Sequence, residues 1–207
     1  MANVNITVDI VLFTIINRRL HLLLIRRLEK PFVGRYALPG GVVLKHESPE
    51  ESAIRELREE TGVENVFLEQ LYTFGEPKRD PSGRVITIAY YALAPHTQSL
   101  HSTTDAADAA WFPLTELPPL AFDHRKIVDV AHARLRNKLD YTNVGFELLG
   151  PKFTISDLQM VHEAVLGRAL DKRNFRRRLS QQNIVVPLEE WLYTGRRPAG
   201  LYRFRSV

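Results

Sequence analysis

The sequence predicts an α/β domain followed by a small winged helix-turn-helix domain. Two observations predict this fold class. In the first part of the chain, apolar runs of strand length surround a strongly capped helix. The last part has the order helix, short turn, basic helix and basic hairpin, which is typical of a winged helix-turn-helix. With 207 residues, of which 44% are hydrophobic and 25% charged, the chain can bury both cores.

Four runs of the first domain are predicted β-strands, because their apolar residues alternate or form short unbroken stretches. They span residues 4–15, 20–25, 66–74 and 85–93. Asn17 and Arg18 separate the first two runs, and a turn signal at 80–83 separates the last two. We therefore expect two antiparallel pairs.

One helix is predicted over residues 49–61. Ser48 is a favourable N-cap, Pro49 suits the first helical position, and Glu51 stands three residues after the cap. Gly62 is placed to end the helix.

A second helix is predicted over 123–140, where apolar residues recur at helical spacing. The following stretch, 143–152, contains two glycines and a proline, which favour a break between domains. We expect the α/β domain to cover residues 1–145 and the winged helix-turn-helix to cover 146–207.

The tail has its own start and stop signals. Thr154 is a candidate cap for a helix that runs to about Leu166, and Gly167 ends it. Asp171 caps a second helix that extends to residue 182. The runs 184–193 and 201–207 are predicted to pair as strands, which completes the winged order.

The composition excludes several kinds of site. The chain has no cysteine, so it has no disulfide framework, thiolate zinc site or cysteine nucleophile. Its seven histidines are scattered and none pairs at metal-ligand spacing. The longest apolar runs are about half the roughly 20 residues that span a bilayer, and no leader segment is evident. We expect a cytoplasmic protein without a membrane partner.

Charge is unevenly distributed along the chain. Residues 1–151 carry 17 Lys and Arg against 19 Asp and Glu, whereas residues 152–207 carry 11 against 5. A mildly acidic body with a basic tail indicates a polyanionic partner for the tail alone.

Three carboxylates lie on one face of the helix at 49–61. Glu56, Glu59 and Glu60 have the spacing i, i+3 and i+4, so they repel one another unless a cation lies among them. Oxygen-only ligation suits Mg²⁺ or Mn²⁺, which also bind diphosphate oxygens and can activate a water molecule. The alternative is an acidic face that is merely solvated.

The segment from Gly41 to Val63 matches the pattern G-x5-E-x7-R-E-U-x-E-E-x-G-U, in which U is a bulky aliphatic residue. This segment resembles a Nudix box. The resemblance implies a Nudix α/β/α sandwich and Mg²⁺-dependent cleavage of a nucleoside diphosphate derivative. It also implies catalytic roles for Glu47, Arg55 and Glu56, with a metal held by Glu56, Glu59, Glu60 and the Gly40 carbonyl.

The stretch RDPSGRVITIAYYAL and the later LAFDH resemble the branch of Nudix proteins that handles ADP-ribose. The resemblance implies that Arg79 and Arg84 contact phosphate or ribose. Arg35, Tyr36 and Gly41 would also contact the ligand. The alternative is that these are turn residues exposed by geometry. Many Nudix hydrolases have a further glutamate in the loop before the strand that corresponds to WFPL. Here residues 96–110 contain no glutamate, and their only acidic residues are Asp105 and Asp108.

The second tail helix presents residues suited to DNA. If Phe175 and Leu179 face the core, helical spacing turns another set outward: Arg173, Asn174, Arg177 and Gln181. Arginine suits guanine, and asparagine and glutamine suit adenine. A further basic set would reach phosphates from the helix and the wing: Lys172, Arg176, Arg178, Arg196, Arg197 and Arg203. The alternatives are a solvated basic helix and a dimerisation module.

The tail segments KFTISDLQMVHEAVLGRALDKRNFRRRL and GRRPAGLYRF resemble the DNA-binding domain of the Nudix-related transcriptional regulators. The resemblance implies a homodimer that binds ADP-ribose or a related nucleotide or sugar phosphate and changes its affinity for an inverted-repeat operator in double-stranded DNA. The rival hypothesis is an active Mg²⁺-dependent pyrophosphatase that converts ADP-ribose to AMP and ribose 5-phosphate, or hydrolyses a related nucleoside diphosphate derivative. Both activities could coexist in one chain.

Overall fold

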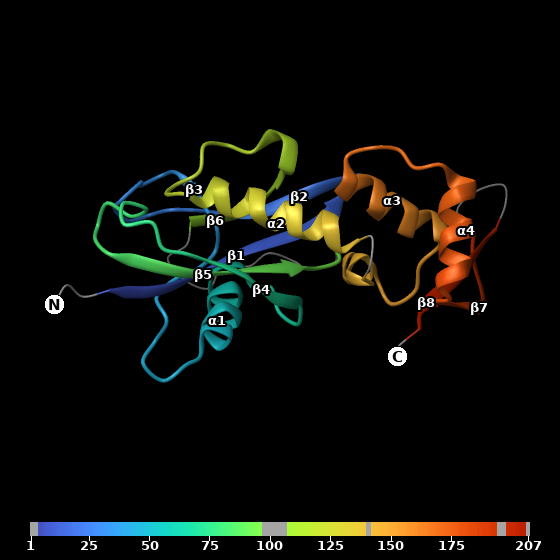
Figure 1. Ribbon diagram of the computed structural model, residues 1–207, viewed down its shortest axis with the longest axis horizontal. Coiled ribbons are helices and arrows are strands. Elements are labelled where there is room, and N and C mark those ends of the chain that lie inside the picture. Colours follow the sequence, from blue (N-terminus) through green and yellow to red (C-terminus); the bar gives the residue numbers. More distant parts are fainter. Residues whose placement is uncertain (1–3, 97–106, 140–141, 194–197, 206–207) are drawn as a thin grey trace.

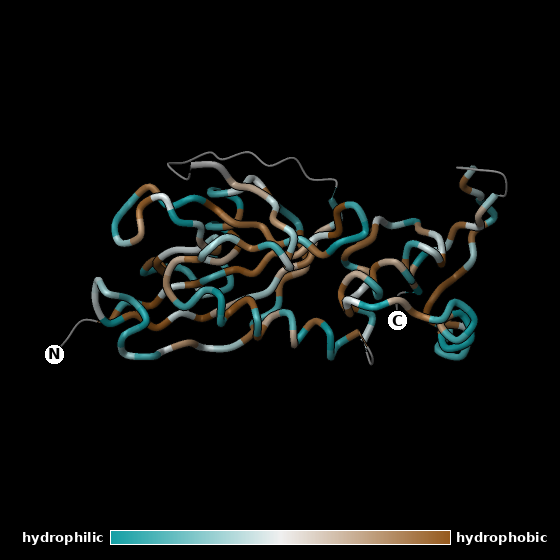
Figure 2. The backbone as a smooth tube through the Cα atoms, turned by 90° about the horizontal axis from the view of Figure 1, so that it is seen from above, coloured by the Kyte–Doolittle hydropathy of each residue, from teal (hydrophilic) through white to brown (hydrophobic). Residues whose placement is uncertain are grey.

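The computed structural model describes residues 4–96, 107–139, 142–193 and 198–205. The described chain forms two lobes side by side along the long axis of the molecule (Figure 1). The larger lobe holds the N-terminal sheet with α1 and α2, and the smaller one holds α3, α4, β7 and β8. Brown apolar segments concentrate inside the larger lobe, whereas the helix at the far end of the smaller lobe is mostly teal (Figure 2).

The larger lobe is built on a six-stranded mixed sheet with the strand order β3-β2-β1-β5-β4, in which β6 also pairs with β2. The strands are β1 (Asn5–Ile16), β2 (Arg19–Arg26), β3 (Tyr36–Ala37), β4 (Phe67–Phe74), β5 (Val85–Leu93) and β6 (Ala107–Pro113). Both predicted antiparallel pairs are confirmed. The parallel pairing of β1 with β5 joins them into one sheet.

Two helices cover opposite faces of this sheet, which gives the α/β/α layers that the resemblance to Nudix proteins implies. Successive side chains of β2 point to opposite faces of the sheet. Leu23 packs on the side of α1 (Pro49–Thr61), while Leu22 and Leu24 pack on the side of α2 (His124–Lys138). Short 3-10 turns follow β6 (η1, Leu114–Glu116) and α2 (η2, Val144–Leu148).

The predicted boundaries of α1 are confirmed, because local interactions set both ends. Ser48 and Glu51 form a reciprocal capping box, and Pro49 occupies the first turn. Gly62 ends the helix with φ 72°, in the left-handed region that glycine tolerates best.

The smaller lobe contains α3 (Ile155–Leu166), α4 (Lys172–Gln182), and the hairpin of β7 (Val185–Leu192) and β8 (Ala199–Phe204). The predicted caps Thr154 and Asp171 each accept a hydrogen bond from the third residue of their helix. Gly167, at φ 68°, ends α3. The predicted winged order is therefore confirmed.

Helix α3 is shared by two hydrophobic cores. Leu158 packs with Phe175 and Leu179 of α4 in the core of the smaller lobe. Val161 and Val165 belong instead to the core that contains α2 and the α2-facing side of the sheet, where they are 0% and 1% exposed. The two lobes are thus joined by continuous apolar packing. Among the described residues, no helix combines the length and apolar character needed to cross a membrane.

Candidate functional site

Arg55 lies at the centre of the acidic face of α1. Its Nε and Nη2 atoms donate to the two carboxylate oxygens of Glu47, over 2.9 and 2.7 Å. Its Nη1 atom donates to Glu56 and Glu59, over 2.9 and 3.2 Å. The positive charge of the guanidinium thus offsets the repulsion among these three carboxylates. The hydrogen bonds from Arg55 lower the pKa of Glu47 to about 2.

Glu60 faces the cleft from the last turn of α1. Its Oε2 atom accepts a hydrogen bond from the N–H of Gly40 over 2.8 Å. Burial raises the pKa of Glu60 to about 8, against 4.5 ordinarily, and the nearby carboxylates of Glu56 and Asp9 add to the rise. Burial likewise raises the pKa of Glu56, although Arg55 opposes this.

The glycine pair between β3 and α1 approaches its neighbours closely. A Cβ atom on Gly40 would lie 2.1 Å from the carbonyl oxygen of Val8, and one on Gly41 would lie 2.1 Å from Glu56 Oε1. Buried carboxylates beside close backbone fit a divalent cation, which would favour their charged forms. In the described part of the chain, however, no group of three acidic or histidine side chains is already arranged to hold a metal ion.

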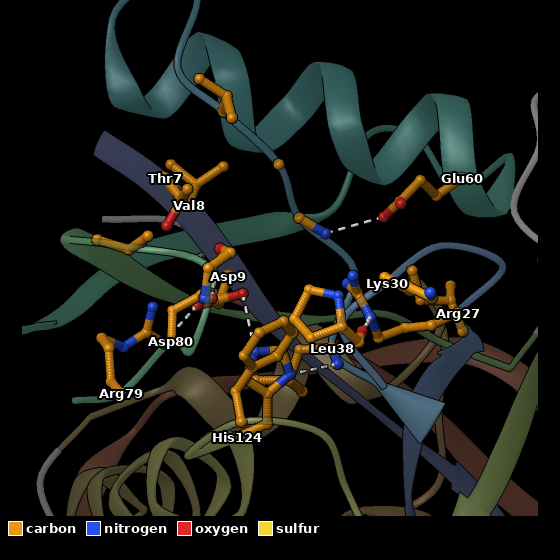
Figure 3. A pocket seen from close by; sticks show the side chains of 18 residues that line it. Thr7, Val8, Asp9, Arg27, Lys30, Leu38, Glu60, Arg79, Asp80 and His124 are labelled. Atoms are coloured by element: carbon orange, nitrogen blue, oxygen red, sulfur yellow. Dashed lines mark hydrogen bonds and ion pairs between the residues drawn. The ribbon is translucent and has the colours of Figure 1, made fainter. Parts of the chain in front are cut away.

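A cleft of about 230 Å³ opens between α1 and the start of α2 (Figure 3). Its walls come from β1, the segment after β2, the Gly40–Gly41 turn, the loop between β4 and β5, and the residues around the start of α2. Arg27 and Lys30 line it from one segment, and Phe122 supplies an aromatic ring. The cleft therefore offers cations, an apolar surface and close backbone together, which suits a phosphorylated ligand.

A buried charge network forms the floor of this cleft. Arg79 donates to Asp123 over 2.7 and 3.2 Å and to Asp9 over 3.3 Å. His124 Nε2 lies 3.3 Å from Asp9, while its Nδ1 accepts the N–H of Leu38 over 2.9 Å. Since Nδ1 is an acceptor, the proton of the imidazole is on Nε2. Burial lowers the pKa of His124, which favours the neutral ring.

The structure brings only some of the expected ligand residues into the cleft. Gly41 and Arg79 line it. Arg84 donates instead to the carbonyl of Gly75, Arg35 lies against the ring of Phe32, and Tyr36 packs on Phe112. These last three are not among the residues that line the cleft.

Sequence reasoning missed Asp9, Arg27, Lys30 and His124 as residues of the cleft. A signal was available for Asp9, the only charge within the apolar run VDIVLFTII. His124 belongs to the LAFDH segment, which is part of the resemblance to Nudix proteins that handle ADP-ribose, but the residue itself was not singled out. Asp105 lies outside the described residues.

The outward face of α4 forms a candidate DNA interface, whose geometry agrees with the helical-spacing argument. Phe175 and Leu179 are each 6% exposed. The expected base-reading residues are all exposed: Arg173, Asn174, Arg177 and Gln181. Lys172 and Arg176 line a groove of about 640 Å³ between α4, the start of α3 and β8.

The remaining basic residues of the expected DNA interface differ in placement. Arg178 is exposed, and its guanidinium lies 5.9 Å from the ring centre of Phe175. Arg203 is exposed on β8. Arg196 and Arg197 lie outside the described residues.

The fold and these two sites define a Nudix domain joined to a winged helix. Residues 6–131 match the NUDIX domain family, and residues 145–204 match the NrtR DNA-binding winged helix domain. The chain belongs to the NrtR family of Nudix proteins.

The chain is similar to a transcriptional repressor and, over about half its length, to a pyrophosphatase. It is 37% identical to the ADPR responsive transcriptional repressor NtrR of Acinetobacter baylyi, over 96% of this chain and 81% of that one. Over 114 residues it is 43% identical to an ADP-ribose pyrophosphatase of Methanocaldococcus jannaschii, covering 55% of this chain and 67% of that protein.

The third relative, Shewanella oneidensis NrtR, has two informative crystal structures. The complex with a 27mer DNA superposes with a TM-score of 0.87 at 36% identity, over 97% of this chain and 93% of that chain. Its NUDIX domain complexed with ADP ribose superposes with a TM-score of 0.60 at 37% identity, over 65% of this chain and 90% of that chain.

Proposed function

We propose that this protein is an ADP-ribose-responsive, DNA-binding transcriptional repressor. The observation that carries the proposal is the pairing of a charged cleft in a Nudix domain with an exposed, basic recognition helix in one continuously packed chain. The relatives support it, since one is named an ADPR responsive repressor and another was crystallised with DNA and, as its NUDIX domain, with ADP ribose.

The DNA-binding role rests on α4. Arg173, Asn174 and Arg177 carry the donors and acceptors that read base edges in the major groove. Lys172 and Arg176, in the groove beside α3 and β8, are positioned for phosphates that flank the contacted bases. One such helix contacts only a few base pairs, so we propose a homodimer and an inverted-repeat operator.

The cleft at α1 is the proposed ADP-ribose site. Arg27 and Lys30 supply positive charge for the diphosphate, and the ring of Phe122 provides an apolar surface for a base or a ribose. Gly41 permits close approach of the backbone. Arg79 contributes through its buried network, because its guanidinium is already engaged by Asp123 and Asp9.

A second candidate function is pyrophosphatase activity on ADP-ribose. It is favoured by the ordered acidic cluster, in which Arg55 holds Glu47, Glu56 and Glu59 beside the same cleft. Glu56, Glu59 and Glu60, with the carbonyl of Gly40, are the proposed ligands of Mg²⁺ or Mn²⁺. When bound, that ion would supply charge neutralisation at the diphosphate and activation of water. Arg55 would then orient the carboxylates, with Glu47 holding the guanidinium.

The experiment that tests the proposed function measures both activities on one preparation. A duplex is first selected from a random DNA pool by the full-length protein. Its retention is then followed with and without ADP-ribose in EDTA, and release of AMP is followed with Mg²⁺. Retention that weakens with salt and with uncleaved ADP-ribose supports the repressor. AMP release without any DNA retention would contradict the repressor and support a pyrophosphatase instead.

A further inference from the structure

Helix α2 runs along the larger lobe towards α3 of the smaller lobe (Figure 1). Its first residue, His124, lines the cleft. The helix has 15 residues, so it is about 22 Å long. Its inner face is buried by Ile127, Ala131 and Leu135, each 0% exposed. A helix packed in this way moves as a rigid unit more readily than it bends.

The N-terminal end of α2 belongs to the floor of the cleft. Asp123 occupies the N-cap position, yet its side chain makes no capping hydrogen bond. Its carboxylate is engaged by Arg79, which lines the cleft together with His124, the first residue of α2. A ligand in the cleft therefore lies beside the Arg79–Asp123 pair, through which its charge can act on the start of α2.

The other half of α2 contacts α3 through a specific polar contact. His132 Nε2 lies 3.0 Å from the carbonyl oxygen of Val165, in the last turn of α3. Around this contact, Ala131 and Leu135 of α2 share a core with Val161 and Val165 of α3. Movement of α2 along its axis therefore shifts or breaks the His132 contact.

Helix α3 in turn fixes the start of the recognition helix. Glu163 Oε1 accepts hydrogen bonds from the N–H of Leu170 and from Gln159, over 2.9 and 3.0 Å. This holds the turn immediately before α4. Leu158 of α3 also shares the hydrophobic core of the smaller lobe with Phe175 of α4. The position of α4 thus follows the position of α3.

From this chain of contacts we propose that α2 transmits ligand occupancy from the cleft to α4, and that His132 is the positioning residue at the junction. The proposal rests on the proposed function, because it concerns how ADP-ribose changes DNA affinity. It assigns a role to His132 that neither ligand binding nor DNA contact requires.

The test measures a coupling factor, defined as the ratio of the DNA dissociation constants with and without saturating ADP-ribose. The full-length protein and its selected duplex are used in EDTA. The His132→Leu variant fills the space without a donor, whereas His132→Gln retains an N–H near the position of Nε2. Arg125→Ala, which removes an exposed pair with Asp129 on the same helix, is the matched control.

We expect His132→Leu to reduce the coupling factor by roughly threefold or more, towards one. Its affinity for ADP-ribose should be unchanged. His132→Gln and Arg125→Ala should keep the wild-type factor. A His132→Leu variant that retains the wild-type factor would overturn the proposed transmission through α2. A wild-type protein whose DNA affinity is the same with and without bound ADP-ribose would instead overturn the proposed function.

Amide hydrogen exchange in residues 166–171 provides a readout that does not depend on DNA. ADP-ribose should change protection of this turn in the wild type and in His132→Gln, and leave it unchanged in His132→Leu. Equal changes in amide protection in His132→Leu and the wild type would overturn the proposed transmission through α2. Thermal denaturation of each variant checks that it is folded.

Discussion

The carboxylate of Glu60 accepts a hydrogen bond from the backbone N–H of Gly40, and this contact joins the last turn of α1 to the glycine turn at the cleft. Burial raises the pKa of Glu60 to about 8. In the absence of metal, the folded protein therefore holds a proton near neutral pH that the unfolded chain has released.

The pH dependence of stability should report this proton. The folded state binds more protons than the unfolded state between the ordinary pKa of 4.5 and about 8. The contribution of Glu60 is therefore fully present below pH 4.5 and is lost as pH rises towards 8. Relative to Glu60→Gln, the wild type should lose roughly 2–4 kcal/mol across this window. Urea unfolding of both proteins in EDTA measures the difference, and a difference independent of pH would contradict the assignment.

Alanine substitutions at the two adjacent glycines should have contrasting effects. Gly40→Ala places a Cβ against the backbone oxygen of Val8, which cannot move away, so we expect a loss of about 2–4 kcal/mol in unfolding free energy. Gly41→Ala meets the flexible end of Glu56, so its stability should change by less than about 1 kcal/mol. Any metal-dependent hydrolysis should nevertheless fall in Gly41→Ala. Denaturant titration and AMP release separate the two effects, and equal losses of stability would argue against this geometry.

Glu59→Gln should abolish any Mg²⁺-dependent AMP release and leave DNA affinity in EDTA unchanged, because Glu59 lies on α1 in the other lobe from α4. Anion-exchange analysis of products and fluorescence anisotropy of a labelled duplex measure the two activities. Loss of DNA binding by a folded Glu59→Gln protein would contradict this separation of roles.

Arg177→Ala and Lys172→Ala should weaken DNA binding in different ways. Arg177→Ala should lose roughly 1–3 kcal/mol of discrimination at one base position. Lys172→Ala should weaken all duplexes similarly and reduce the salt slope by about one. Competition with single-base variants across several salt concentrations checks both. A uniform effect of Arg177→Ala would place that side chain on phosphate instead.

The sequence predicted the elements that local interactions determine. Ser48, Glu51 and Gly62 fix the ends of α1, and the spacing of Phe175 and Leu179 fixes the inner face of α4. These signals lie within a few residues of one another, so a single sequence contains them.

The cleft could be predicted only in part, because long-range pairing builds its floor. Arg79 meets Asp123 and Asp9 across 44 and 70 positions of the chain. Nothing in the local pattern distinguishes such a buried arginine from one in an exposed turn. The sharing of α3 between two cores was hidden for the same reason, since its apolar residues could face either partner.

The central claim is that one chain links ADP-ribose in the Nudix cleft to DNA on the winged helix. The most direct measurement is the anisotropy of the selected duplex titrated with full-length protein in EDTA, with and without saturating ADP-ribose. We predict salt-sensitive binding whose dissociation constant rises at least about fivefold with ADP-ribose. The same dissociation constant under both conditions, with ADP-ribose binding verified by calorimetry, would contradict the account.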